Sequence, residues 1–249
     1  MNANADIKTD AASEDYLWDR RYENEGLIWG DDESPTCREL SESLKPNSNV
    51  FEVGFGYGRD LTSLASQGHS VTGIERSMVA FNMAANAIDE ANLEKDTHLI
   101  KGHFEKASLP EEKFDALLSH RVLHLLGNGQ VKGFVNQASY ILKPGGLLVA
   151  SSRDMRDFNP DKMQWREDGQ AEYTSPERKG HIIDFWNEDK FRQVFEKKFD
   201  IEGFIESDEI ESLGTDDRSK FTIMIARKKQ PVQPANDTGN SAPPAPGGN

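Results

Sequence analysis

The chain has 249 residues, of which only 36% are hydrophobic, and a formal net charge of −14. Such a charge argues against a nucleic-acid substrate, because nucleic acids attract positive surfaces. The single cysteine, Cys37, excludes an intrachain disulfide and a cysteine-rich metal site, which is typical of a reducing compartment. Because no apolar run has the length of a signal peptide or a membrane span, the sequence predicts a cytoplasmic protein without a membrane partner.

Both ends of the chain differ in composition from its middle. Residues 1–14 are polar, and residues 230–249 are rich in Pro, Gly and Asn. Neither end can bury enough apolar surface to offset the entropy lost on ordering, so we predict that both are disordered. Residues 15–229 have ample hydrophobic side chains for one folded domain. These patterns do not define an oligomeric state.

From residue 49 onward, short apolar runs alternate with helical patterns. Strands are expected at residues 49–53, 70–74, 98–101, 116–119 and 147–150. Ser77 is a candidate N-cap for a helix that runs to about residue 91, and a second helix is expected at residues 130–142, before a Lys-Pro-Gly-Gly turn. Strands that alternate with helices imply βαβ crossovers and a parallel sheet covered on both faces.

The last third of the chain has a different pattern. Residues 151–186 show no clean period, and we predict that they form an insert that caps the substrate site, because loops of this length are usually functional or mobile. Asn187 is a candidate cap for a further helix. Residues 200–206 and 221–226 then predict a closing antiparallel pair. The acidic run at Glu206–Glu211 is interpreted as a solvated face.

The most informative motif is Glu52-Val-Gly-Phe-Gly-Tyr-Gly58, at the end of the first expected strand. An open parallel sheet binds ligands at this edge, and glycine lets the backbone approach a ligand closely. The spacing differs from the dinucleotide fingerprint, because Arg59 stands where its third glycine belongs. Glu75 ends the second strand, where a carboxylate can accept both hydroxyls of a ribose. The alternatives are a tight strand-to-helix turn and a solvated strand-end charge.

Together with Phe-Asp-Ala-Leu-Leu-Ser119 and Leu142-Lys-Pro-Gly-Gly-Leu-Leu-Val, these motifs resemble those of class I S-adenosylmethionine-dependent methyltransferases, from about residue 49 to 226. The segment from Trp18 to Pro35 is similar to the N-terminal part of thiopurine and tellurite-type small-molecule methyltransferases, where it folds over the cofactor. The resemblance implies an α/β, Rossmann-like three-layer sandwich with a seven-stranded, mostly parallel sheet whose last strand is antiparallel. It also implies that residues 15–48 form a lid.

The same resemblance implies S-adenosyl-L-methionine as the cofactor. The backbone of the glycine loop would approach its methionine part, with Glu52 near the ammonium and Glu75 at the ribose. The expected cofactor-binding residues are Trp18, Tyr22, Trp29, Glu52, Gly54, Phe55, Gly56, Gly58, Glu75, Arg76, Met78, His103, Phe104 and Ser119. Met78, His103 and Phe104 would flank adenine, although the family often has an acidic residue in place of His103.

The residues just past the fourth strand, His120 and Arg121, are the candidate catalytic residues. One of these two residues or His124, which follows shortly after, could act as a base or hold the substrate. The alternatives are that His124 is satisfied on the next helix and that Arg121 belongs to a structural ion pair. Trp18, Tyr22 and Trp29 could face the sulfonium by cation–π attraction or could pack the N-terminal helix onto the sheet.

The resulting functional prediction is methyl transfer from S-adenosylmethionine to a small-molecule acceptor, by in-line displacement. A soft sulfur, selenium or tellurium nucleophile would need little help from a base, whereas an amine or hydroxyl would need one, with His120 as the first candidate. No Asn-Pro-Pro-Tyr motif, Pro-Cys nucleophile or metal-ligand spacing is present. The alternatives are a non-catalytic S-adenosylmethionine-binding regulator and, less favoured by the glycine spacing, a dinucleotide or nucleotide-sugar enzyme.

Overall fold

A computed structural model of the chain describes residues 10–176 and 178–231. Most of the predicted disordered tail, residues 230–249, lies outside the described residues, as do the first nine residues of the predicted disordered N-terminus. Helix α1 (Asp10–Glu25) begins before the predicted boundary at residue 15. Residues 10–14 therefore belong to a helix, which corrects that part of the prediction.

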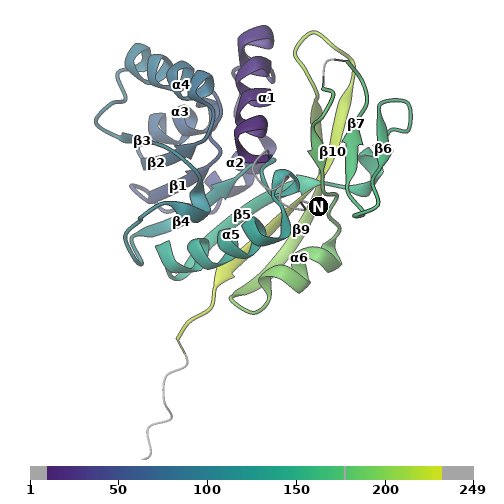
Figure 1. The fold of residues 1–249 in the computed structure, drawn as a ribbon. Coiled ribbons are helices and arrows are strands. Elements are labelled where there is room, and N and C mark those ends of the chain that lie inside the picture. Colours follow the sequence, from purple (N-terminus) through teal and green to yellow (C-terminus); the bar gives the residue numbers. More distant parts are fainter. Residues whose placement is uncertain (1–9, 177, 232–249) are drawn as a thin grey trace, which may run out of the picture.

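A seven-stranded sheet forms the centre of the molecule, with the strand order β3-β2-β1-β4-β5-β10-β9 (Figure 1). The strands are β1 (Asn49–Val53), β2 (Ser70–Glu75), β3 (Thr97–Lys101), β4 (Phe114–Ser119), β5 (Leu142–Arg153), β9 (Phe199–Ile210) and β10 (Arg218–Lys228). Strands β1 to β5 are parallel, and β10 pairs antiparallel with both β5 and β9. The predicted mostly parallel sheet with an antiparallel last strand is confirmed.

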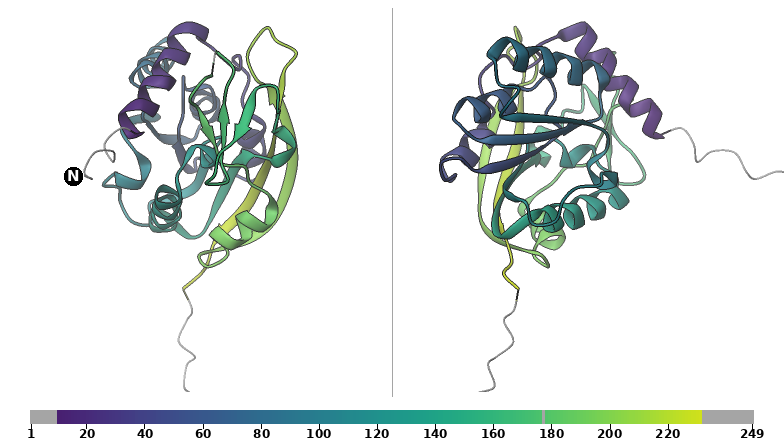
Figure 2. Two further views of the ribbon diagram at one scale, coloured as in Figure 1. Left: turned by 45° about the vertical axis from the view of Figure 1, so that its right-hand side comes forward. Right: turned by 90° about the vertical axis from the view of Figure 1, so that its left-hand side faces the viewer.

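Helices cover both faces of this sheet (Figure 2). On one face lie α2 (Pro35–Ser41), α3 (Arg59–Ser66) and α4 (Met78–Ala91), and on the other lie α5 (Asn128–Ile141) and α6 (Glu188–Phe195). Adjacent residues of β1 pack on opposite faces of the sheet: Val50 lies in the core formed with α2–α4, and Phe51 lies in the core formed with α5 and α6. This alternation is what a strand buried on both faces requires. The predicted three-layer sandwich is confirmed.

The predicted helix caps are present. Ser77 Oγ accepts a hydrogen bond from Ala80 N at 3.1 Å, and Asn187 Oδ1 accepts one from Lys190 N at 3.0 Å. Each bond satisfies a backbone donor that the first turn of a helix leaves free. No helix in the described ranges is long and apolar enough to cross a membrane.

The segment after β5 contains more regular structure than its sequence pattern suggested. Strand β5 extends to Arg153, and residues 154–186 then form a second, three-stranded antiparallel sheet of β6 (Met163–Trp165), β7 (Ala171–Tyr173) and β8 (Ile182–Ile183). This small sheet has its own apolar cluster. Strands β9 and β10 are also longer than expected and form a hairpin that rises beside the small sheet (Figure 1).

Candidate functional site

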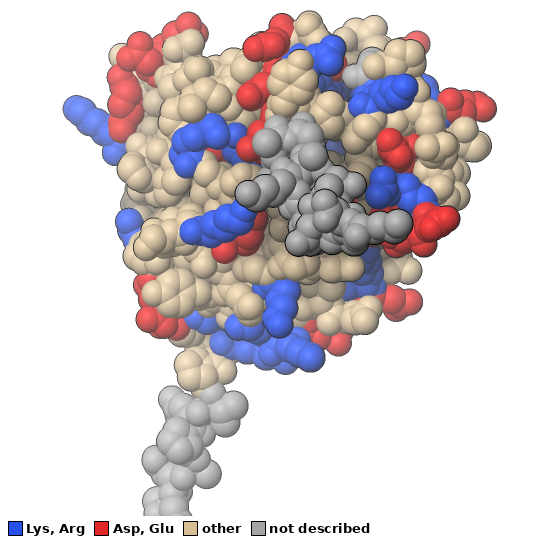
Figure 3. Space-filling model, viewed as in Figure 1, with Lys and Arg blue, Asp and Glu red and all other residues tan. Residues whose placement is uncertain are grey.

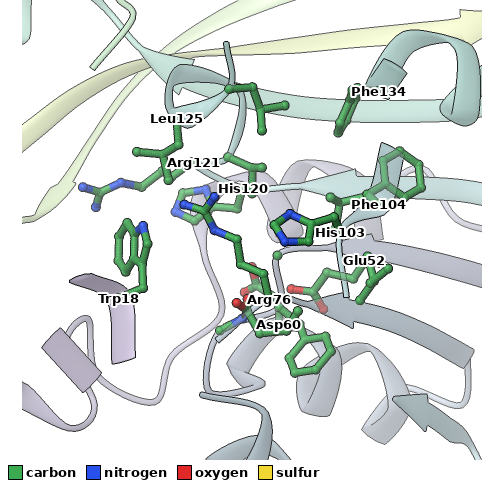
Figure 4. Close-up of a pocket in the computed structure, with 18 of the residues that line it drawn as sticks. Trp18, Glu52, Asp60, Arg76, His103, Phe104, His120, Arg121, Leu125 and Phe134 are labelled. Atoms are coloured by element: carbon green, nitrogen blue, oxygen red, sulfur yellow. Dashed lines mark hydrogen bonds between the residues drawn. The ribbon is translucent and has the colours of Figure 1, made fainter. Parts of the chain in front are cut away.

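A pocket opens where the strand order reverses, at the carboxyl ends of β1, β2 and β4 (Figure 4). Open parallel sheets place ligands at this position, because the loops on either side of the reversal diverge. The walls come from the glycine loop, from the ends of β2 and β3, from the segment after β4, and from α1 with the loop that follows it. We call this the cofactor pocket.

The glycine loop forms the floor of the cofactor pocket. Gly54 and Gly56 have φ angles of 72° and 55°, which side-chain-bearing residues rarely adopt. A Cβ on Gly54 would lie 2.5 Å from Val122 Cγ2, and one on Gly56 would lie 2.8 Å from Tyr22 Oη. Gly58 does not line the pocket: its Cβ position lies 2.9 Å from Ala84 Cβ, so this glycine lets α3 approach α4.

One end of the pocket is strongly acidic. Glu52, Asp60 and Glu75 are all buried there. Glu75 is held rigidly, because Oε2 accepts a hydrogen bond from Gly56 N at 3.0 Å and Oε1 accepts one from Ser77 N at 2.7 Å. Glu52 Oε2 is buried and has no hydrogen-bond partner among the described residues. Burial and the neighbouring Asp60 raise the pKa of Glu52 well above its usual value. A cationic group at this end would relieve that cost.

Two of the three residues expected near adenine line the pocket, as does Arg76, another expected cofactor-binding residue. Arg76, His103 and Phe104 line the pocket, and the Phe104 ring packs 5.2 Å from that of Phe134. Met78 does not line it, and half of its surface is exposed. The first turn of α4 is instead capped by α1, since Asp19 Oδ1 accepts hydrogen bonds from Ser77 Oγ and Val79 N. The predicted contact of Met78 is therefore not found.

The aromatic residues of the N-terminal segment line the pocket and also pack. The rings of Trp18 and Tyr22 lie 5.8 Å apart, and Trp29 stacks on Tyr57 of the glycine loop at 6.2 Å. Tyr57 Oη donates a hydrogen bond to Gly30 O at 2.8 Å. The two alternatives weighed for these aromatics are thus compatible, because the same rings fix the N-terminal segment to the loop and face the pocket.

His120 lies at the pocket wall with both ring nitrogens engaged. Nδ1 lies 2.7 Å from Thr36 Oγ1 and 3.1 Å from Ser151 Oγ, and Nε2 lies 3.1 Å from Glu209 Oε2. Burial lowers the pKa of His120, while Glu209 opposes this shift. The hydrogen bonds at both ring nitrogens therefore hold the ring in one orientation. Ser119, just before it, is fully buried and does not line the pocket.

Arg121 has an unusual backbone and an extensive set of partners. Its φ of 56° lies in the left-handed region, and its backbone N donates a hydrogen bond to Ser151 Oγ at 3.0 Å. Its guanidinium pairs with Glu209 at 3.3 Å and Glu211 at 2.8 Å and lies over the Trp29 ring. Strained backbone is held by its surroundings and concentrates at functional sites.

The acidic run at residues 206–211 is not a solvated face, contrary to our interpretation of the sequence. Glu209 is 8% exposed, and its carboxylate binds Arg59 at 2.7 Å as well as Arg121 and His120. Although burial opposes it, His120, Arg59 and Arg121 hold the pKa of Glu209 far below its usual value. Because β9 continues to Ile210, alternate side chains point inward, and only Glu206 and Asp208 remain at the surface.

A family model described as a methyltransferase domain matches residues 50–146, the part that holds the glycine loop, both buried glutamates and β4. Residues 50–146 are therefore similar to a methyltransferase domain. Among curated relatives, a demethylmenaquinone methyltransferase of Tropheryma whipplei is 31% identical over 115 residues, covering 45% of this chain and 44% of the relative. A sterol 24-C-methyltransferase of Gibberella zeae is 25% identical over 126 residues, covering 50% of this chain and 32% of the relative. The chain thus spans less than half of these relatives.

Solved methyltransferase structures share the fold over most of the chain. An S-adenosylmethionine-dependent methyltransferase of Methanosarcina mazei superposes with a TM-score of 0.65 and 20% identity, covering 80% of this chain and all of that one. A Burkholderia thailandensis 1,6-didemethyltoxoflavin N1-methyltransferase with bound S-adenosylhomocysteine superposes with a TM-score of 0.62 and 16% identity. That match covers 92% of this chain and 95% of the other. The fold is also shared by a [4+2]-cyclase, which superposes with a TM-score of 0.61 and 16% identity, covering 88% of this chain and 96% of the cyclase. The thiopurine and tellurite-type likeness stays a prediction.

Proposed function

We propose that this protein transfers a methyl group from S-adenosylmethionine to a small-molecule acceptor. The observation that carries the proposal is the buried, unpartnered Oε2 of Glu52 beside the glycine loop of a methyltransferase domain. An anionic oxygen without a partner in a buried pocket is costly unless a ligand supplies a positive group, and the methionine ammonium of the cofactor is such a group.

The residues present fit this cofactor. Glu75 is fixed by two backbone N–H groups, so its remaining lone pairs are oriented to accept from the ribose hydroxyls. Gly54 and Gly56 leave room for the methionine part, and Phe104 with His103 offers a wall for adenine. When bound, the cofactor supplies an activated methyl group on a sulfonium. The protein's contribution is then to orient the acceptor in line and to exclude water.

The state of His120 bears on the acceptor atom. Since both ring nitrogens are engaged by Thr36, Ser151 and Glu209, the ring is not a free base in this arrangement. This supports an acceptor that is already nucleophilic near neutral pH, such as the soft sulfur, selenium or tellurium centre expected from the sequence. Arg121 and His120 then act as fixed walls that position the acceptor.

The test is a coupled S-adenosylhomocysteine-release assay across thiol, selenide, tellurite, amine and phenol acceptors, together with calorimetry of S-adenosylhomocysteine binding. We expect binding, and turnover with at least one class of acceptor. Binding without turnover on any of them would favour the rival, a non-catalytic regulator; a [4+2]-cyclase with this fold shows that the fold alone does not fix the reaction. Absence of binding would overturn the proposal.

We also propose that residues 15–48 and the insert at 151–186 close over the bound ligands. Trp18 lies against His181 of the insert, with ring centroids 5.4 Å apart, so the two segments meet. A segment that orders on binding shows slower amide exchange when its ligand is present. Hydrogen exchange with and without S-adenosylhomocysteine tests this, and strong protection that is independent of the ligand would contradict it.

A further inference from the structure

A second pocket lies beside the cofactor pocket, between α1, the insert and the β9–β10 hairpin (Figure 1). We call it the arginine pocket. Arg178 lines both pockets, so the two are neighbours. Although the whole chain has a net charge of −14, the charged residues among those that line this pocket are mostly basic. The basic residues are Arg20, Arg21, Arg153, Arg156, Lys162, Arg178, Lys179, Arg218 and Lys220, and the acidic ones are Glu25, Asp157, Glu211 and Asp217.

Three of these arginines are almost completely buried: Arg21 is 4% exposed, Arg153 is 1% and Arg178 is 6%. All three, and Arg121 of the cofactor pocket, converge on one carboxylate, that of Glu211. Two further carboxylates each form an ion pair with one of these arginines: Glu25 with Arg21 at 3.0 Å, and Asp157 with Arg153 at 3.0 Å. The three buried arginines of the pocket are thus matched in number by three carboxylates, of which only Asp157 is buried to a similar degree.

Two hydrogen-bond donors of the cluster also lack an acceptor within the described part of the chain. Among the described residues, Arg178 Nε and Arg21 Nη1 are buried donors without an acceptor. Burial and the nearby Arg153 lower the pKa of Arg178 well below its usual value. A buried charge in this state is costly unless a counter-charge is present. Basic side chains on the upper right of the face in Figure 3 lie over the same elements.

Nine basic and four acidic side chains line this pocket, and two buried guanidinium N–H groups in it lack an acceptor in the ranges that the structure describes. From these observations we propose that the acceptor is a small organic anion whose carboxylate, phosphate or sulfonate group binds in the arginine pocket. The inference deepens the proposed function and rests on it. Guanidinium groups bind such oxyanions through paired, charge-assisted hydrogen bonds, which fix orientation as well as position. An acceptor held in this way through Arg21, Arg153 and Arg178 extends past Arg178 toward the cofactor pocket.

The first experiment uses inorganic phosphate and sulfate as probes and measures the melting temperature at constant ionic strength against sodium chloride. A ligand of the folded state raises that temperature, and we expect about 3 °C or more from either oxyanion. The variants Arg178→Gln and Arg21→Gln should lose this increment. Arg192→Gln, on the exposed face of α6, should keep it. An increment that is the same in all four proteins would be a general salt effect and would overturn the proposal.

The second experiment compares each acceptor that is turned over with its neutral methyl ester. We expect a kcat/KM at least about tenfold higher for the free acid, a preference that Arg178→Gln removes and Arg192→Gln retains. Equal turnover of acid and ester would overturn the inference and leave the methyltransferase proposal intact. If S-adenosylhomocysteine does not bind, the proposed function fails instead, and the phosphate measurement on the wild-type protein still decides whether the pocket binds oxyanions.

Discussion

The cofactor pocket and the arginine pocket are adjacent, but they differ in charge and in how the chain builds them. The acidic residues of the cofactor pocket come from two neighbouring strands and the first turn of α3, with Glu52, Asp60 and Glu75 close together in the sequence. The arginine pocket joins residues that are far apart, and the hydrogen bond from Arg21 to Glu211 spans 190 positions. One site therefore follows from a local motif, whereas the other exists only after α1, the insert and the hairpin have docked.

This difference has consequences for the two ligands. The glycine loop and Glu75 are held by backbone hydrogen bonds within the β1–α4 region, so they can be formed before any acceptor is present. The arginine pocket is held by ion pairs between distant elements, and its lining has more basic than acidic side chains. Substitutions should accordingly affect ligand binding in the first region and folding in the second.

The largest effect is expected from Glu211→Gln. Removing the carboxylate on which four arginines converge leaves buried charges unpaired, and the free energy of unfolding should fall by about 3–5 kcal/mol. The matched control is Glu206→Gln, whose exposed pair with Arg156 should contribute less than about 1 kcal/mol. Urea denaturation measures both. A loss for Glu211→Gln no greater than for the control would show that the cluster does not hold the hairpin.

The next effect concerns the cofactor pocket. Glu75→Ala should weaken S-adenosylhomocysteine binding by about 1.5–3 kcal/mol, the range for hydrogen bonds to a charged group. Calorimetry on the folded variant tests this, with Glu90→Ala on the exposed side of α4 as the control. Unchanged affinity would remove Glu75 from the site. Because the two pockets are built separately, the response of Glu75→Ala to phosphate should equal that of the wild-type protein.

A smaller effect should appear on acidification. Burial and the neighbouring Arg178 lower the pKa of His181 to about 3 from its usual 6.5. Below pH 6.5 the unfolded chain binds a proton that the folded protein does not, so stability falls as the pH is lowered toward the folded value. Between pH 7 and pH 5 this histidine accounts for a loss of about 2 kcal/mol.

The variant His181→Asn should therefore have a shallower dependence of stability on pH than the wild-type protein in this range. His98→Asn, at an exposed position of β3, should leave the dependence unchanged. Denaturant titrations at pH 7, 6 and 5 provide the measurement. Parallel curves for wild type and His181→Asn would mean that the arginines do not act on this histidine.

The smallest effect is expected at Met78. Its side chain is half exposed and does not line the cofactor pocket, so Met78→Ala should change S-adenosylhomocysteine affinity by less than about twofold. Phe104→Leu, in the wall of the pocket, should have a larger effect on the same measurement. A tenfold or greater loss for Met78→Ala would place this residue at the adenine after all.

The parts of the fold that could be predicted from the sequence are those set by local pattern. The strands at 49–53 and 70–74, the caps Ser77 and Asn187 and the parallel order follow from period-two and period-3.6 patterns and from turn chemistry. The insert could not be predicted in this way, because β6, β7 and β8 have at most three residues each, which is too short for a recognisable period.

The sequence by itself determined the parallel part of the sheet and the position of the glycine loop with Glu52 and Glu75, because these depend on contiguous residues and on the direction of parallel strands. Only the tertiary structure decided that Glu209 and Glu211 are buried and that arginines from four distant segments meet them. An acidic run gives the same local signal whether it faces water or guanidinium groups. Its partners are chosen by the docking of the hairpin against α1 and the insert, which is a long-range property of the folded chain.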